Sequence, residues 1–120
     1  MIQIKRVYET AAKSDGKRFL VERLWPRGIK KAALPMTGWI KEVAPSTQLR
    51  QWFNHDPAKW TAFRKRYRAE LDKRPEVWRS LLTATDNGNV TLLYSTHDAE
   101  HNNAVVLRDY LQERLSAGIA

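Results

Sequence analysis

One apolar run, Val90-Thr91-Leu92-Leu93-Tyr94, constrains the fold of this chain more than any other feature. Its β-branched and aliphatic residues follow the turn residues Asp86-Asn87-Gly88-Asn89, and this combination predicts a buried strand. Apolar residues recur at helical spacing on both sides of it, over 57–73 and 98–115. A strand set between helices is typical of α/β domains, in which helices cover a mostly parallel sheet.

Two shorter strands are predicted near the N-terminus, over 2–8 and 18–24. The residues between them include Ser14-Asp15-Gly16 and are typical of a turn. The elements follow one another in the order two strands, several helices, one strand and one helix. This order predicts a single α/β domain over residues 1–120, with a small, mostly parallel sheet layered with helices. The direction of the first strand stays open, because the connection to the second is short for a parallel crossover and long for a tight hairpin.

Candidate capping residues predict where the helices begin. Ser, Thr and Asp side chains accept hydrogen bonds from the first free amides of a helix, and proline fits its first position. The starts predicted in this way are Thr37, for a short helix that ends before Pro45, then Ser46, Asp56 with Pro57, Pro75 and Asp98.

The composition excludes several classes of protein. The 120 residues include no cysteine, which rules out disulfides, a thiol nucleophile, Cys-ligated zinc and iron–sulfur clusters. The first residues lack the apolar stretch of a signal peptide, and the longest aliphatic run, 104–107, is too short to span a bilayer. We therefore expect a cytoplasmic protein with no membrane partner and no cofactor.

The charge of the chain is positive and unevenly distributed. Twenty-one Lys and Arg against thirteen Asp and Glu leave a formal net charge of +8. Residues 1–47 and 48–79 are basic, whereas residues 80–120 carry more acidic than basic side chains. This distribution favours anionic ligands or polyanionic partners, and it also allows a homodimer held by opposite charges. The oligomeric state stays open.

Polar clusters follow the second and third predicted strands, at 22–28 and 95–103. Open α/β sheets hold their ligands beyond the carboxyl ends of the strands. If these two strands are parallel neighbours, both clusters border one crevice.

The first cluster offers groups that bind anions. Arg23 and Arg27 carry planar guanidinium groups, which grip a carboxylate or phosphate through two hydrogen bonds. Trp25 offers a stacking surface for a planar ligand, and Gly28 tolerates a positive φ where the chain leaves the sheet. Each residue also has an ordinary structural interpretation, as a salt-bridged surface arginine, a core tryptophan or a turn glycine.

The second cluster begins after Tyr94, which ends the third strand and is a further candidate ligand contact. We expect Asp98 to cap the last helix and His101, Asn102 and Asn103 to fill its first turn, although all three are weak helix formers. Free amides and the positive end of the helix dipole attract anions at such a place, and Asn side chains add donors. The alternative is that these residues only cap and bridge neighbouring loops.

Together the clusters predict a small anionic or nucleotide-like ligand, and they leave open whether it is turned over. An enzyme of this kind would use His101 or His55 as acid or base, with Asp98 beside them. The string from His97 to His101 matches the H-x-x-E-H pattern of certain zinc peptidases. No metal is predicted, because His97 precedes the expected helix and no third ligand is evident.

A basic run on the helix over 57–73 gives the alternative function, a nucleic-acid-binding or regulatory module. The run is Arg64-Lys65-Arg66-Tyr67-Arg68, and phosphate backbones bind to such groups. On a helical wheel its charges spread across the polar arc, which is the layout of a solvated face. Arg64 borders the apolar stripe and is expected to turn toward a crevice or a partner.

Several strings resemble those of one known family. They are Arg23-Leu24-Trp25-Pro26-Arg27-Gly28, Phe53-Asn54-His55-Asp56-Pro57 and Glu100-His101-Asn102-Asn103-Ala104. The chain is similar, over nearly its whole length, to the YeaO-like branch of domain-of-unknown-function family 488 (DUF488). The resemblance implies a bacterial, stand-alone cytosolic α/β domain without an established activity. It places these residues on signature positions: Arg23, Trp25, Pro26, Arg27, Gly28, His55, Asp56, Tyr94, His101 and Asn102.

The wider family resembles this chain less closely near His101, where it has a Cys-His-Arg-type string. Because this chain has no cysteine, thiol chemistry proposed for such relatives does not carry over to it.

Overall fold

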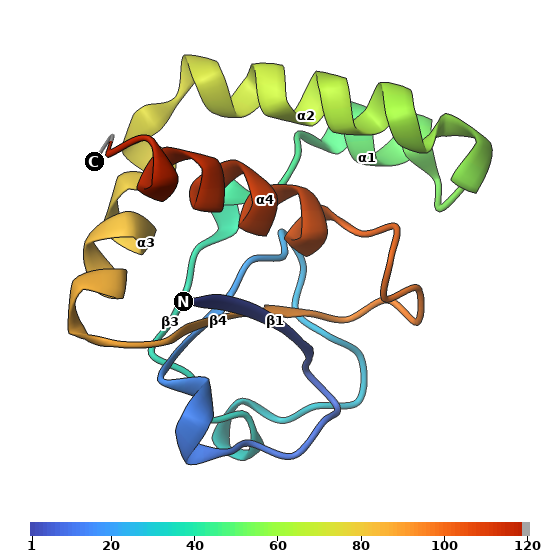
Figure 1. Ribbon diagram of the computed structural model, residues 1–120. Coiled ribbons are helices and arrows are strands. Elements are labelled where there is room, and N and C mark those ends of the chain that lie inside the picture. Colours follow the sequence, from blue (N-terminus) through green and yellow to red (C-terminus); the bar gives the residue numbers. More distant parts are fainter. Residues whose placement is uncertain (119–120) are drawn as a thin grey trace.

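A four-stranded parallel sheet forms the centre of the molecule. The computed structural model describes residues 1–118 (Figure 1). The strands are β1 (Ile2–Arg6), β2 (Lys17–Leu20), β3 (Gly38–Trp39) and β4 (Val90–Tyr94), in the spatial order β1-β4-β2-β3. β4 pairs in parallel with β1 and β2, so the first strand, whose direction the sequence left open, runs with the others.

The helices are layered on this sheet. They are α1 (Thr47–Phe53), α2 (Trp60–Lys73), α3 (Arg79–Ala84) and α4 (Asn103–Ser116). α4 lies directly against β1 and β4, and α2 packs on α4 and α1 (Figure 1). Fully buried side chains fill the space between the layers, among them Leu81, Leu92, Leu107 and Leu111. The predicted single α/β domain is confirmed. Within residues 1–118, no helix is long and apolar enough to cross a membrane.

The sheet face opposite α4 carries a buried charged network. Asp15 and Arg18 are only 4% and 6% exposed and form an ion pair, which Lys5 joins at 3.0 Å from the Asp15 carboxylate. The Thr91 hydroxyl donates to the Asp15 carbonyl at 2.7 Å. Burial alone would raise the pKa of Asp15, but hydrogen bonds from the Ala12 amide, Lys5 and Arg18 outweigh it and hold the pKa below its usual value. The network ties β1, β2 and β4 together.

β2 ends at Leu20, four residues before the predicted end of this strand. The reason is that side chains take the next two carbonyls in place of a neighbouring strand. Asn103 Nδ2 donates to the Val21 carbonyl at 2.8 Å, and Trp39 Nε1 donates to the Glu22 carbonyl at 2.6 Å. The chain after Leu20 therefore leaves the sheet early.

The helix predicted to start at Thr37 is wrong. Thr37 instead joins β2, because its amide donates to the Arg18 carbonyl and its hydroxyl accepts from the Arg18 amide. The segment that follows forms β3 and then a single 3₁₀ turn, Lys41–Val43. Pairing with an existing strand overrides the capping signal.

The helix starts predicted at Ser46, Asp56 and Pro75 are confirmed. Ser46 Oγ accepts from the third amide of α1 at 3.2 Å. Asp56 Oδ1 accepts from the Ala58 amide at 3.0 Å and opens a 3₁₀ turn that leads into α2. Pro75 opens a similar turn before α3.

Asp98 does not cap the last helix, contrary to the prediction. Its Oδ1 accepts from the amides of Glu100 and His101, at 3.0 and 2.9 Å, and so closes a separate turn. The cap of α4 is Asn102, whose side-chain oxygen accepts from the Val105 amide at 3.1 Å. His101 therefore precedes the helix and does not lie in its first turn.

This assignment predicts unequal costs for two alanine substitutions. We expect Asn102→Ala to lower the free energy of unfolding by about 1 kcal/mol, the usual cost of a lost helix cap. Asp98→Ala should cost less, because Asp98 holds only its own turn and the His101 ring and caps no helix. Urea denaturation of the two variants measures both costs. A larger loss for Asp98→Ala would contradict the assignment of Asn102 as the cap of α4.

Candidate functional site

A crevice of about 770 Å³ opens at the carboxyl ends of β1, β2 and β4. Its walls come from the segments that follow these strands, from α1 and the loop after it, from Phe63 of α2 and from the start of α4. The two polar clusters, 22–28 and 95–103, both border it, although some seventy residues of sequence separate them. They meet because β2 and β4 are parallel neighbours in the sheet.

The charged groups in the wall of this crevice are mostly positive. Four arginines line it, together with three histidines and a single carboxylate. The arginines are Arg6, Arg23, Arg27 and Arg50, the histidines are His55, His97 and His101, and the carboxylate is Glu22. Cations gathered in a concave surface with low-dielectric walls attract anions.

Two of the four arginines are tied to the protein backbone. Arg6 Nε donates to the carbonyls of Ser95 and Thr96, at 3.1 and 2.8 Å. Arg23 donates to the carbonyls of Ala44 and Pro45, at 3.0 and 3.2 Å. Both side chains therefore position loops as well as lining the crevice, and an alanine at Arg23 would disturb the loop before α1.

The other two arginines keep their donors available. Within residues 1–118, neither the Arg27 nor the Arg50 guanidinium forms a hydrogen bond or an ion pair with the protein. Arg27 is exposed and Arg50 is half-buried on α1. Two guanidinium groups with unused donors, at the wall of one crevice, are the arrangement that carboxylates and phosphates bind.

His101 is held in a fixed orientation at the crevice wall. Its Nδ1 lies 3.0 Å from Asp98 Oδ2, and its ring meets Trp60 edge-on at 5.1 Å. Hydrogen bonds from the Glu100 amide and then from His101 hold the pKa of Asp98 below its usual value, despite some burial. Since Nδ1 is taken by Asp98, Nε2 is the ring nitrogen left for a ligand.

His55 lies on the loop after α1 and is exposed. It and the preceding Asn54 both have left-handed backbones, with φ of 56° and 46°. His97 is also exposed. No group of three or more His, Asp or Glu within residues 1–118 is arranged to hold a metal ion.

Glu22 brings a negative charge into this positive wall. Its Oε1 accepts from the Ser95 amide at 3.1 Å, at the end of β4. Burial raises the pKa of Glu22, although the Ser95 amide and the positive charge of Arg50 act in the opposite direction.

Most of the predicted site residues lie together in the crevice. Those that line it are Arg23, Trp25, Arg27, His55, His101, Asn102 and Asn103, and Asp98 supports it through His101. Gly28 has the expected positive φ, of 74°, but does not line the crevice. Tyr94 is 4% exposed and belongs to the core. Trp25 packs edge-on against Trp39, and its indole donates to the Ile29 carbonyl.

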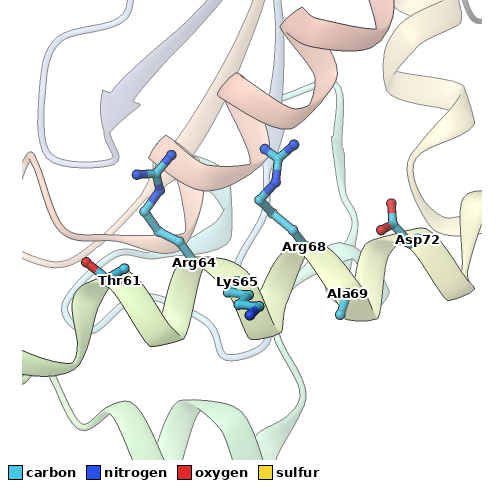
Figure 2. Close-up of a pocket in the computed structure, with 6 residues that line it drawn as sticks. All are labelled: Thr61, Arg64, Lys65, Arg68, Ala69 and Asp72. Atoms are coloured by element: carbon cyan, nitrogen blue, oxygen red, sulfur yellow. The ribbon is translucent and has the colours of Figure 1, made fainter.

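Arg64 does not turn into this crevice. It lies exposed on α2, where Figure 2 shows it beside Arg68, with both side chains directed toward α4. They border a separate groove of about 460 Å³ that is lined by α2 alone: Thr61, Arg64, Lys65, Arg68, Ala69 and Asp72. Arg68 forms two hydrogen bonds with Glu113 of α4, so part of the positive charge in this groove is already neutralised.

Sequence reasoning missed Arg6 and Arg50 as site residues. Arg6 ends β1, and only the parallel direction of that strand places it at the crevice. Its position at the end of a predicted strand would have placed Arg6 at the crevice if the direction of that strand had been known. Arg50 lies in the middle of α1 with no motif around it, and only the packing of α1 beside the strand ends brings it there.

Comparisons with known proteins identify the family of the chain and name no ligand. The model of the DUF488-N3i family, described as the inactive DUF488-N3 subclade, matches residues 1–119. The uncharacterised protein YeaO of Escherichia coli is 45% identical over 111 residues, which cover 92% of this chain and 96% of YeaO. The uncharacterised protein Rv3073c of Mycobacterium tuberculosis is 36% identical over 113 residues, 94% of this chain and 95% of the relative. No solved structure matches. The chain therefore belongs to the DUF488-N3i family.

Proposed function

We propose that this protein binds a small anionic or nucleotide-like ligand in the crevice at the carboxyl ends of β1, β2 and β4. The observation that carries the proposal is the pair Arg27 and Arg50, which line the same crevice and whose guanidinium donors have no partner within residues 1–118. A charged donor held at a concave surface binds an anion more strongly than one on an open helix.

Three further observations support this assignment. The volume of about 770 Å³ falls in the usual range for small-molecule sites. The wall combines apolar residues, such as Leu24 and Phe53, with a few polar groups, as such sites do. The family is described as inactive, which favours binding without turnover. Under this proposal His101 contacts the ligand and does not act as an acid or base.

The proposal is tested by following backbone amide signals of the ¹⁵N-labelled protein during titration with pyrophosphate and, separately, with AMP. We expect saturable shifts in segments 22–28 and 95–103, and no comparable shifts along 64–72 of α2. The first two segments border the crevice, whereas the third lies on the separate α2 groove. If neither compound causes shifts, or if the shifts are confined to residues 64–72 of α2, the proposal is disproved.

The same titration with a single-stranded oligonucleotide examines the alternative, a nucleic-acid-binding helix. On α2, Arg68 is paired with Glu113, and the Arg66 guanidinium stacks over Trp52 at 4.1 Å. These contacts engage two of the four cations of the run. The other two, Arg64 and Lys65, are exposed on α2, where water competes for an anion more than it does in the crevice. Binding through α2 would instead give a steep loss of affinity with salt and a dependence on Lys65.

A further inference from the structure

Glu22 is the one carboxylate among the crevice-lining residues, and only one of its two oxygens is used by the protein. Oε1 accepts from the Ser95 amide at 3.1 Å and lies 3.5 Å from the Ser95 hydroxyl. Within residues 1–118, Oε2 has no hydrogen-bond partner and Glu22 forms no ion pair. Among these residues no buried side-chain oxygen or nitrogen lacks a partner, so the unpartnered Oε2 keeps some exposure to solvent, and Glu22 lines the crevice.

Two other carboxylates that are shielded by the fold, Asp15 and Glu70, have both oxygens engaged. Asp15 binds Lys5 and Arg18. The two oxygens of Glu70 accept from the amide and the hydroxyl of Ser46, at 2.9 and 2.6 Å. Glu22 leaves one oxygen unused, as Asp56 and Asp109 do, but of these three carboxylates only Glu22 lines the crevice.

A purely structural role does not require the charge of Glu22. Glu22 links the chain after β2 to the end of β4 by accepting a hydrogen bond from the Ser95 amide. A neutral side-chain amide oxygen would accept the same hydrogen bond. A half-buried carboxylate costs free energy by desolvation, and it repels the bare anions that Arg27 and Arg50 attract. A ligand that brings its own donor to Oε2 removes both disadvantages.

From this arrangement we infer that the crevice selects anions that also carry an amino group or another N–H donor, with the anionic group on Arg27 and Arg50 and the donor on Glu22 Oε2. The inference rests on the proposed function, since it concerns the same crevice. A charge-assisted hydrogen bond between the donor and the carboxylate supplies the selectivity. Ligands of this class include amino-bearing nucleotides and small amino phosphates.

The experiment compares two matched pairs of probes by isothermal titration calorimetry. The first pair is AMP and purine riboside 5′-monophosphate, and the second is 2-aminoethyl phosphate and ethyl phosphate. Within each pair only the amino group differs, and the two pairs span different distances. We expect the amino member of at least one pair to bind about tenfold more tightly to the wild-type protein, the effect of one charge-assisted hydrogen bond.

The matched variant is Glu22→Gln, which keeps an acceptor for the Ser95 amide and removes the charge. We expect it to abolish the preference for the amino probe while the phosphate without the amino group binds as well or better. Equal affinities within both pairs on the wild-type protein would overturn the inference and leave the proposed function intact. A preference that survives in Glu22→Gln would also overturn it. Failure of all four probes and pyrophosphate to bind would overturn both proposals.

Discussion

Replacing both Arg27 and Arg50 with alanine is expected to weaken pyrophosphate binding by at least a hundredfold. Each guanidinium can form charge-assisted hydrogen bonds worth about 1.5–3 kcal/mol, and about 1.4 kcal/mol corresponds to a factor of ten. The stability of the fold should change little, because neither guanidinium bonds to the protein within residues 1–118, and surface substitutions that break no such contact usually cost under about 0.5 kcal/mol each. Calorimetry gives the affinity, and urea denaturation gives the stability.

The control for this double variant removes two positive charges elsewhere. Arg74 and Arg79 are both exposed, lie near the start of α3 and do not line the crevice. Their double alanine variant has the same net charge as Arg27→Ala/Arg50→Ala. We expect it to lower the affinity only slightly, through the weaker overall field, and less so at high salt. Equal losses in the two double variants would mean that net charge, and not the crevice, binds the anion.

Asp15→Ala is expected to lower the free energy of unfolding by about 3–5 kcal/mol, the usual cost of removing one partner from a buried ion pair. The substitution leaves the Arg18 guanidinium, 6% exposed, without its counter-ion and without solvent. It also removes the acceptor of Lys5 on β1. Urea denaturation at pH 7 measures the loss.

Two comparisons show whether the unpaired charge is the cause. Asp15→Ala combined with Arg18→Met should regain part of the loss, since the buried charge is gone and an apolar side chain takes its place. A double variant as unstable as Asp15→Ala alone would point to the Ala12 turn instead, where the Asp15 carboxylate also accepts the amide.

The second comparison uses pH. Because the pKa of Asp15 is lower in the folded protein than in the unfolded chain, its ionised form stabilises the fold at pH values above the unfolded pKa of about 4. That contribution declines as the pH falls through the folded pKa. The difference in unfolding free energy between wild type and Asp15→Ala should therefore be full at pH 7 and smaller at pH 3. A difference that does not shrink would exclude the carboxylate charge as its source.

Much of the fold was predictable because local patterns and tertiary packing agree. The run from Val90 to Tyr94 is a strand buried along its whole length, as its apolar residues predict. The stripe of Phe63, Tyr67 and Leu71 lies in the core, as its helical spacing predicts. The α/β class follows from the order of these elements.

The errors fall where several residues compete for the same local role. Asp98 and Asn102 both have side chains that cap helices, and the sequence gives no reason to prefer the second. Asn102 caps α4 because Asp98 is taken by the amides of its own turn and by His101. Thr37 also has a side chain that can cap a helix, but its amide and hydroxyl form hydrogen bonds with the Arg18 backbone of β2 instead.

The sequence by itself determined the family, the α/β class, the buried strand over 90–94 and the two polar clusters that follow β2 and β4. Only the tertiary structure decided that β1 is parallel, that Arg6 and Arg50 join the crevice, and that Arg64 stays outside it. The physical reason is one of range. Strand and helix signals depend on neighbours within a few residues, whereas the crevice wall depends on strand direction and helix packing, which side chains far apart in the chain fix together.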